Sequence, residues 1–205
     1  PSGESSSYRS NPYRLSRLAL SRRDPGYAHR TDVFRAGAME ITGDAPTEID
    51  TYSELEDGEA ADVKSKILAA LADIKLDGSI GYGTLVAARR PGDGSAREQA
   101  ASCQRVLGGA ANFAKEYATK RYRSNCINWG MLPFLVEDPS VFELGDCIYL
   151  PGVRKALLEA ADTMPAVAVK PDGSVKEFTV KLGALTDAER QILADGCLIN
   201  YYKNN

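Results

Sequence analysis

The clearest periodic pattern in the chain lies between Asp62 and Leu76, where apolar residues recur at the three- and four-residue spacing of a helix. These apolar residues are Val63, Ile67, Leu68, Leu71 and Ile74. A stripe of this kind is typical of a helix that packs one face on a core. We therefore predict an amphipathic helix here, and we interpret its stripe as core and not as part of a cofactor site.

The middle of the chain alternates strand-like and helix-like segments. The apolar run at residues 79–88 and the segment 110–115 each predict a buried strand. A helix is expected over about 96–107, ended by two glycines, and another over 117–130, ended by Gly130. Strands and helices in this order are typical of an α/β layer.

The last third contains further strand signals and one capped helix. Residues 146–150 predict a strand, and residues 166–182 predict a hairpin whose turn is the sequence PDGS. The segment 185–196 predicts a helix, because Thr186 and Glu189 stand at the spacing of a capping box. We expect an α/β fold with a mixed sheet.

The first 62 residues have a different character from the rest. Pro12 suits the first turn of a short helix within residues 12–23, and we expect loops on either side of it. We therefore predict a single domain over 1–205, with a partly irregular N-terminal region at 1–62 that includes an acidic loop. The α/β core is expected at 63–205.

The composition is that of a soluble globular protein, with 43% hydrophobic and 26% charged residues. No apolar run approaches the roughly 20 residues that a membrane-spanning helix needs, and the polar opening does not resemble a signal peptide. We expect a cytoplasmic protein with no membrane partner.

The formal net charge of −3 conceals an uneven distribution. The segment Glu40–Asp62 contains nine acidic residues and no Lys or Arg, which is typical of a solvated loop or face. By contrast, Gly81–Asn125 contains eight basic residues against three acidic ones. The basic segment is the better candidate for contact with an anion.

The four cysteines lie far apart in the sequence and form no CxxC pair. They are Cys103, Cys126, Cys147 and Cys197, and the chain has one histidine, His29. We interpret the cysteines as reduced thiols in a reducing compartment, and we do not expect a self-contained metal site.

The sequence RRPGDGSAREQAAS at Arg89–Ser102 has three structural interpretations. Ser95 and Glu98 fit a capping box, so Ser95 is a candidate helix cap. The same helix start, with the guanidinium of Arg97, could bind a carboxylate. A nucleotide cradle fits less well, because the glycine spacing matches neither phosphate-binding fingerprint. His29 is far from Ser95 in sequence, so a serine-hydrolase triad is not expected.

GDGSAREQAA together with VLGGAANFAKEYATKRYRSNCINWGMLPF resembles the C-terminal swivel domain of the aconitase family of iron–sulfur hydro-lyases. The family shows a strand, then GSSREH opening a helix, then a Leu-Gly strand and a helix that ends in G-[IL]-L-P. The resemblance is clearest from Ile80 to Phe134 and weaker through Gly196. Upstream, SSYRSNP resembles the arginine-bearing loop of the family.

The resemblance implies a swivelling three-layer β/β/α domain and assigns roles to four residues. Ser95 matches the serine that acts as the base, and Arg97 matches an arginine that binds a substrate carboxylate. Arg9 matches the substrate-binding arginine of the upstream loop, and Ala96 stands at the substrate-binding position where the family has a second serine. Gln99 replaces the histidine of the family.

The resemblance also implies a cofactor and a partner. It implies a [4Fe–4S] cluster on domains or a large subunit outside this chain, none bound by this chain, and a small di- or tricarboxylate as substrate. The chain is then a fragment or small subunit of an aconitate hydratase-like enzyme, inactive when isolated. The alternative is a non-enzymatic module that binds anions or RNA, although nucleic acid is the less expected partner because few aromatic residues are interleaved with the basic ones.

Overall fold

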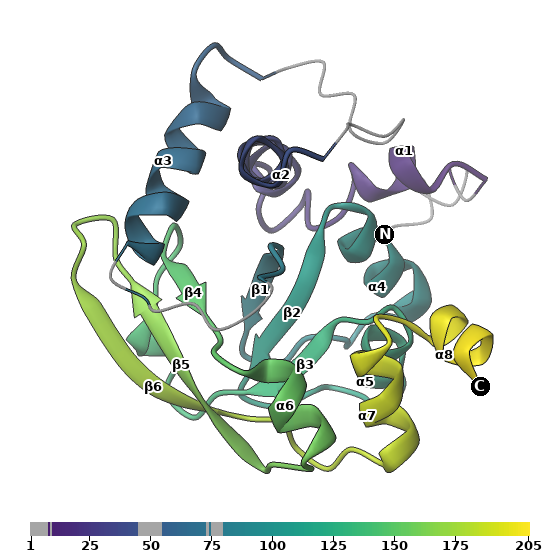
Figure 1. Ribbon diagram of the computed structural model, residues 1–205. Coiled ribbons are helices and arrows are strands. Elements are labelled where there is room, and N and C mark those ends of the chain that lie inside the picture. The colour runs from purple at the N-terminus through teal and green to yellow at the C-terminus, as the bar shows by residue number, and fades with distance from the viewer. Residues whose placement is uncertain (1–7, 9, 45–54, 73, 75–79) are drawn as a thin grey trace. The chain divides into compact units, whose positions relative to one another are not determined.

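The computed structural model describes residues 8, 10–44, 55–72, 74 and 80–205 (Figure 1). The chain falls into two compact units, one of residues 1–84 with 102–109 and the other of residues 85–101 with 110–205. Part of the acidic loop predicted within 40–62 lies outside the described residues. Arg9 also lies outside them.

The described residues of the first unit form three complete helices. They are α1 (Pro12–Ser16), α2 (Tyr27–Thr42) and α3 (Glu59–Leu71). The short helix α1 was predicted, and its Pro12 lies in the first turn, where the Asn11 side chain accepts a hydrogen bond from the amide of Arg14. The α3 helix was predicted as well.

The helix α2 lies where the sequence suggested loops, so that prediction was wrong. Its buried positions include Ala28, Thr31, Gly37 and Ala38, which are small residues that give little hydrophobic signal. A Cβ added to Gly37 would lie 2.7 Å from the carbonyl oxygen of Ala60, so α2 and α3 approach closely at this point. The helix α2 therefore packs through small residues that allow close approach to α3, and it lacks the broad apolar stripe by which a sequence usually reveals a helix.

The apolar stripe of α3 is less buried than its spacing indicated. Ile67 is buried, but Leu68 is 47% exposed. The helix was therefore predicted correctly, and the expectation that its whole stripe is core was wrong.

The second unit is built on a six-stranded sheet with the strand order β1-β2-β3-β6-β5-β4. The strands are β1 (Thr84–Ala88), β2 (Gly109–Ala114), β3 (Leu132–Leu135), β4 (Cys147–Tyr149), β5 (Thr163–Val169) and β6 (Val175–Lys181). β2 and β3 are parallel, whereas β3–β6, β5–β6 and β4–β5 are antiparallel. The predicted α/β class with a mixed sheet is confirmed.

Helices connect and cover these strands. They are α4 (Arg97–Val106), α5 (Lys120–Asn128), α6 (Val153–Leu158), α7 (Asp187–Ala194) and α8 (Leu198–Asn204), with a 3-10 turn at Pro139–Val141. Figure 1 shows α5 and α7 side by side. The predicted capping box of α7 is present, because Thr186 and Glu189 exchange side-chain and backbone hydrogen bonds.

The core of the second unit contains a cluster of aromatic rings. Phe113 of β2 lies edge-on to Phe134 of β3, with ring centroids 5.8 Å apart, and also contacts Phe142 and Phe178. Complete burial of a Phe side chain contributes about 1.5–3 kcal/mol. The strand β3, which supplies Phe134, was not predicted, because its sequence LPFL is short and contains a proline.

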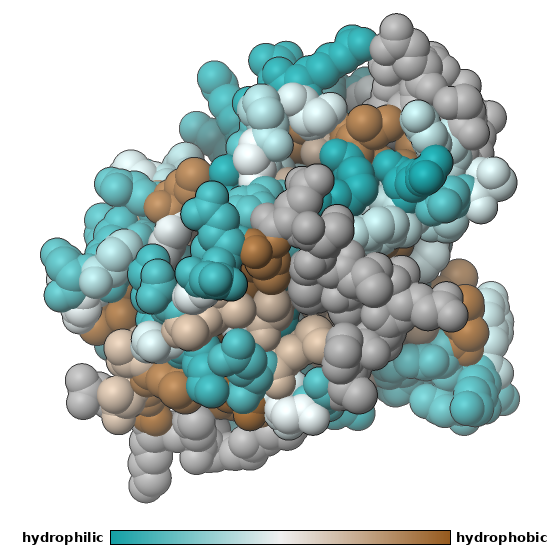
Figure 2. Space-filling view, turned by 90° about the horizontal axis from the view of Figure 1, so that it is seen from above, coloured by the Kyte–Doolittle hydropathy of each residue, from teal (hydrophilic) through white to brown (hydrophobic). Residues whose placement is uncertain are grey.

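Apolar residues on the face seen in Figure 2 form several small groups separated by hydrophilic residues. Scattered groups of this kind are ordinary for a protein surface. Among the residues that the structure describes, no helix is both long and apolar enough to cross a membrane.

Candidate active site

Ser95 lies in the loop that leaves β1 and enters α4, and its side chain is exposed. The amide of Ala100 donates a 3.0 Å hydrogen bond to the carbonyl oxygen of Ala96. Since the N-cap residue is the one whose carbonyl accepts the first helical bond, Ala96 occupies the N-cap position of α4. Ser95 is thus free of the capping role that its sequence spacing suggested.

The capping box predicted for Ser95 and Glu98 is therefore wrong. Glu98 instead accepts a hydrogen bond of 2.7 Å from the indole nitrogen of Trp129, which follows α5. A capping box needs this carboxylate to turn back toward the helix start, and the indole holds it elsewhere.

Arg97 is the first residue of α4 and carries the strongest sign of an anion site. Its Nε atom is buried and has no hydrogen-bond partner among the residues that the structure describes. A buried guanidinium nitrogen without a partner is costly, and a bound carboxylate would satisfy it with two parallel hydrogen bonds. The positive end of the α4 dipole lies at the same place.

The structure therefore keeps Ser95, Ala96 and Arg97 together at one helix start. Arg9, the fourth predicted site residue, lies outside the described residues, so its placement stays a prediction.

The loop between β1 and α4 is held by the segment that follows β2. The amide of Glu116 donates to the carbonyl oxygen of Arg89 at 3.2 Å, and the amide of Ala118 donates to that of Pro91 at 2.9 Å. These bonds place the residues after β1 beside those after β2. Ligands of open α/β sheets commonly bind at this position, outside the carboxyl ends of the strands.

Gly92 fixes the next point of the loop by close contact with α5. Its φ is +92°, and a Cβ added to it would lie 2.5 Å from Cβ of Tyr122. Only glycine accepts this conformation and this approach without strain. The sequence showed a glycine-rich turn but gave no indication that Tyr122 lies against it.

Beneath the loop lies a buried polar group made of Asn112, Tyr122 and Cys126. The Asn112 amide donates to Sγ of Cys126 at 3.3 Å and lies 3.5 Å from the hydroxyl of Tyr122. Burial raises the pKa of the Cys126 thiol to about 11, and it also raises the pKa of Tyr117. Cys126 and Tyr117 are therefore neutral at pH 7 and add no charge beneath the loop.

Exposed cations follow β1 and β2 and begin α5. They are Arg89, Arg90, Lys115, Lys120 and Arg121. Arg90 forms an ion pair with Glu116 at 3.3 Å. Arg123 donates to the carbonyl oxygens of Leu182 and Ala184, so its role is structural. The positive charge at this end of the sheet favours an anionic ligand.

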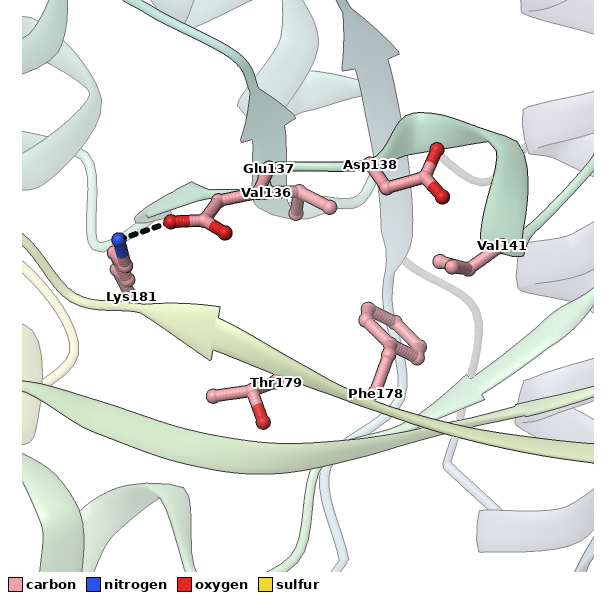
Figure 3. A pocket seen from close by; sticks show the side chains of 7 residues that line it. All are labelled: Val136, Glu137, Asp138, Val141, Phe178, Thr179 and Lys181. Carbon is pink, nitrogen blue, oxygen red and sulfur yellow. Dashed lines mark hydrogen bonds and ion pairs between the residues drawn. The ribbon is translucent and has the colours of Figure 1, made fainter.

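A pocket of about 270 Å³ lies beyond the end of β3 (Figure 3). Its lining consists of Val136, Glu137, Asp138, Val141, Phe178, Thr179 and Lys181. The hydrogen bond from Lys181 lowers the pKa of Glu137, and the bond from Ser140 lowers that of Asp138. Both carboxyl groups are thus ionised at neutral pH, so this pocket does not suit a carboxylate ligand.

The described residues do not fit an iron–sulfur cluster. They include no group of three His, Cys, Asp or Glu side chains that could hold a metal ion. Cys103 and Cys126 are buried, Cys147 and Cys197 are partly exposed, and none of the four forms a disulfide.

Comparison with protein families gives one match that covers the site. Residues 53–139 match the family described as the aconitase C-terminal domain. This segment contains Ser95, Ala96, Arg97 and all of the loop contacts described above. The resemblance stated from the sequence is confirmed over these residues.

Comparison with solved structures gives a crystal structure of 3-isopropylmalate dehydratase from Methanocaldococcus jannaschii, at 26% identity and a TM-score of 0.37. The match covers 58% of this chain and 63% of that chain, so this chain spans less than two thirds of that structure. No curated protein matches the chain.

Proposed function

We propose that this chain, whose residues 53–139 match the aconitase C-terminal domain, is part of a hydro-lyase that acts on a small di- or tricarboxylate. The observation that carries the proposal is the α4 helix start, where an exposed Ser95 adjoins an Arg97 whose buried Nε lacks a partner among the described residues. The family match adds the reaction class.

In this proposal Arg97 binds one carboxylate of the substrate. Its fork of N–H donors fits the two oxygens of a carboxylate, and the α4 dipole adds to the attraction. Arg9 is the second carboxylate clamp in the same proposal. Ala96 lines the substrate side of the helix start, where its methyl group offers no hydrogen bond.

Ser95 takes the proton from the carbon next to the bound carboxylate. The hydroxyl serves as a base only if its anionic form is stabilised, and we assign that purpose to the positive end of α4 and to Arg97, two residues along the chain. The exposed position of Ser95 leaves its oxygen open to a bound substrate.

The proposal places the [4Fe–4S] cluster on other domains or on a large subunit. When bound there, the cluster supplies a Lewis acid toward the leaving hydroxyl group. This chain then provides only the base and the carboxylate clamps, so the isolated chain is expected to be inactive.

Titration of the full chain with citrate, followed by NMR, tests the carboxylate site. The amides of Ser95, Arg97 and Gln99 are expected to shift, and Arg97→Gln is expected to abolish the shifts. Arg121→Gln, which removes an exposed cation from α5, is the matched control and should leave binding within about threefold, because exposed charges contribute little. Equal losses in the two variants would show diffuse attraction and contradict an Arg97 site.

The alternative function, an RNA-binding module, has the exposed cations after β1 and β2 in its favour. The neighbouring aromatic residues count against it. Tyr122 is buried beneath Gly92, and the indole nitrogen of Trp129 is bonded to Glu98. Sequence-tolerant RNA binding needs accessible rings for stacking. A steep salt dependence of binding to single-stranded RNA, with no response to citrate, would favour the alternative.

A further inference from the structure

Thr119 uses one hydroxyl group to join α5 to the loop that carries Ser95. Its Oγ1 donates a hydrogen bond of 3.3 Å to the carbonyl oxygen of Gly92. The same Oγ1 accepts a hydrogen bond of 3.3 Å from the amide of Tyr122, in the first turn of α5. A hydroxyl can do both, because it has one proton to donate and lone pairs to accept.

The bond to Gly92 is the last fixed point before Ser95. In the part of the chain that the structure describes, no hydrogen bond holds Asp93, Gly94 or Ser95, and all three are exposed. The next fixed point is the carbonyl oxygen of Ala96, which accepts the first bond of α4. The position of Ser95 therefore depends on the two ends of this short span.

The other side-chain caps of the second unit do not act in this way. Thr186 caps α7, and its hydroxyl bonds with Glu189 of the same helix. Thr119, by contrast, bonds to a residue 27 positions earlier in the chain. Helix capping alone requires only the acceptor function of the hydroxyl, so the donated bond to Gly92 calls for another explanation.

We propose that Thr119 is a positioning residue that holds the Ser95 loop in place for proton transfer. The inference rests on the proposed function for its chemical purpose, but the loop contact is tested independently of any activity. Loss of the donated bond should loosen the loop while α5 stays capped.

Hydrogen exchange of two amides in the full chain separates these roles. The amide of Ala118 donates to Pro91 and reports loop docking, whereas the amide of Tyr122 donates to Thr119 and reports the cap. Thr119→Ser keeps both bonds. Thr119→Asp keeps an acceptor for Tyr122 but has no proton to donate at neutral pH. Thr119→Val removes both functions.

The expected result is selective. In Thr119→Asp the Ala118 amide should exchange about 2- to 10-fold faster, which is the usual effect of one hydrogen bond, while the Tyr122 amide stays near its original rate. Thr119→Val should raise both exchange rates, and Thr119→Ser should leave both near the rates of the unmodified chain. Thr186→Val, the matched cap control, should speed exchange of the Glu189 amide and leave Ala118 unchanged.

An unchanged exchange rate of the Ala118 amide in Thr119→Asp overturns the inference.

A second experiment, citrate titration of Thr119→Ser and Thr119→Val, links the loop to ligand binding. Weaker binding is expected only for the valine variant. If the unmodified chain binds no citrate, the proposed function fails, while the exchange rates still decide whether Thr119 holds the loop. Equal citrate binding by both variants counts against the positioning role.

Discussion

The indole nitrogen of Trp129 donates a 2.7 Å hydrogen bond to a carboxylate oxygen of Glu98, and this bond ties the end of α5 to the first turn of α4. Both helices contribute to the candidate site, α4 through Arg97 and α5 through the contacts of Thr119 and Tyr122 with Gly92. The bond also draws the Glu98 carboxylate into a contact with α5, away from the capping role that its spacing suggested.

Replacement of Glu98 tests this link through the single tryptophan of the chain. Glu98→Ala removes the acceptor, so the emission of Trp129 should shift to longer wavelength and the free energy of unfolding should fall by about 0.5–1.5 kcal/mol. Glu98→Gln keeps an acceptor oxygen and should retain most of both properties. Fluorescence and urea denaturation measure the two effects, and identical spectra for the two variants would contradict the contact.

Replacement of Ser95 separates catalysis from stability. Because Ala96 occupies the N-cap position, Ser95→Ala should change the free energy of unfolding by no more than about 0.5 kcal/mol, as is usual at exposed positions. In an enzyme reassembled with its cluster-bearing partner, the same change should lower turnover by about 10²- to 10⁴-fold. Thermal unfolding and steady-state kinetics measure the two quantities. Near-normal turnover by Ser95→Ala or Ser95→Asp would refute the assignment of the base.

Elements with strong local signals could be predicted from the sequence. The capped helix α7 was predictable because Thr186 and Glu189 are three residues apart, and the β5–β6 hairpin because Pro171 and Gly173 mark its turn. The helix α2 was not, because several of its buried positions, such as Ala28, Gly37 and Ala38, are small residues, and the close approach of Gly37 to α3 depends on the tertiary fold. Local propensity says little about such contacts.

In the candidate site too, residues with a local sequence signal could be predicted, and residues that act through distant contacts could not. Ser95 and Arg97 could be selected because they are close in sequence and lie in a recognisable motif. Thr119 and Tyr122 could not, because their contacts with Gly92 join segments that are far apart in the chain. The Ser95 and Glu98 spacing was misleading for a related reason, since a distant indole competes for the carboxylate.

The cysteines should differ in their reactivity toward alkylating reagents. Burial raises the pKa of both Cys103 and Cys126 from 9.0 to about 11, so little thiolate forms at neutral pH. Cys147 and Cys197 are partly exposed and should react first. Mass spectrometry of the folded chain after brief iodoacetamide treatment should find Cys103 and Cys126 unmodified, whereas all four should react in denaturant. Early labelling of Cys126 would contradict its burial.

The same pKa shifts predict a loss of stability at high pH. The folded chain keeps its two buried thiols protonated in a range where the unfolded chain has already lost those protons. The resulting stabilisation is therefore complete below about pH 9 and is lost as the pH rises toward 11. Urea denaturation across this range measures it, and a free energy of unfolding that rises between pH 9 and 11 would show the opposite sign.

Two glycines in the Ser95 loop provide a matched pair for a final prediction. Gly92 has a φ of +92°, and an added Cβ would lie 2.5 Å from Cβ of Tyr122, whereas an added Cβ at Gly94 meets no atom within 4 Å. Gly92→Ala should therefore lower the free energy of unfolding by about 2–4 kcal/mol, through backbone strain and overpacking together. Gly94→Ala should change it by no more than about 1 kcal/mol, because only the flexibility of the chain changes.

Since Gly92 is the last fixed point before Ser95, Gly92→Ala should also weaken citrate binding, and Gly94→Ala should alter it less. Urea denaturation and citrate titration of the two variants measure both effects. Equal stabilities would show that the loop does not lie against Tyr122 as described, and the positioning of Ser95 by α5 would lose its structural basis.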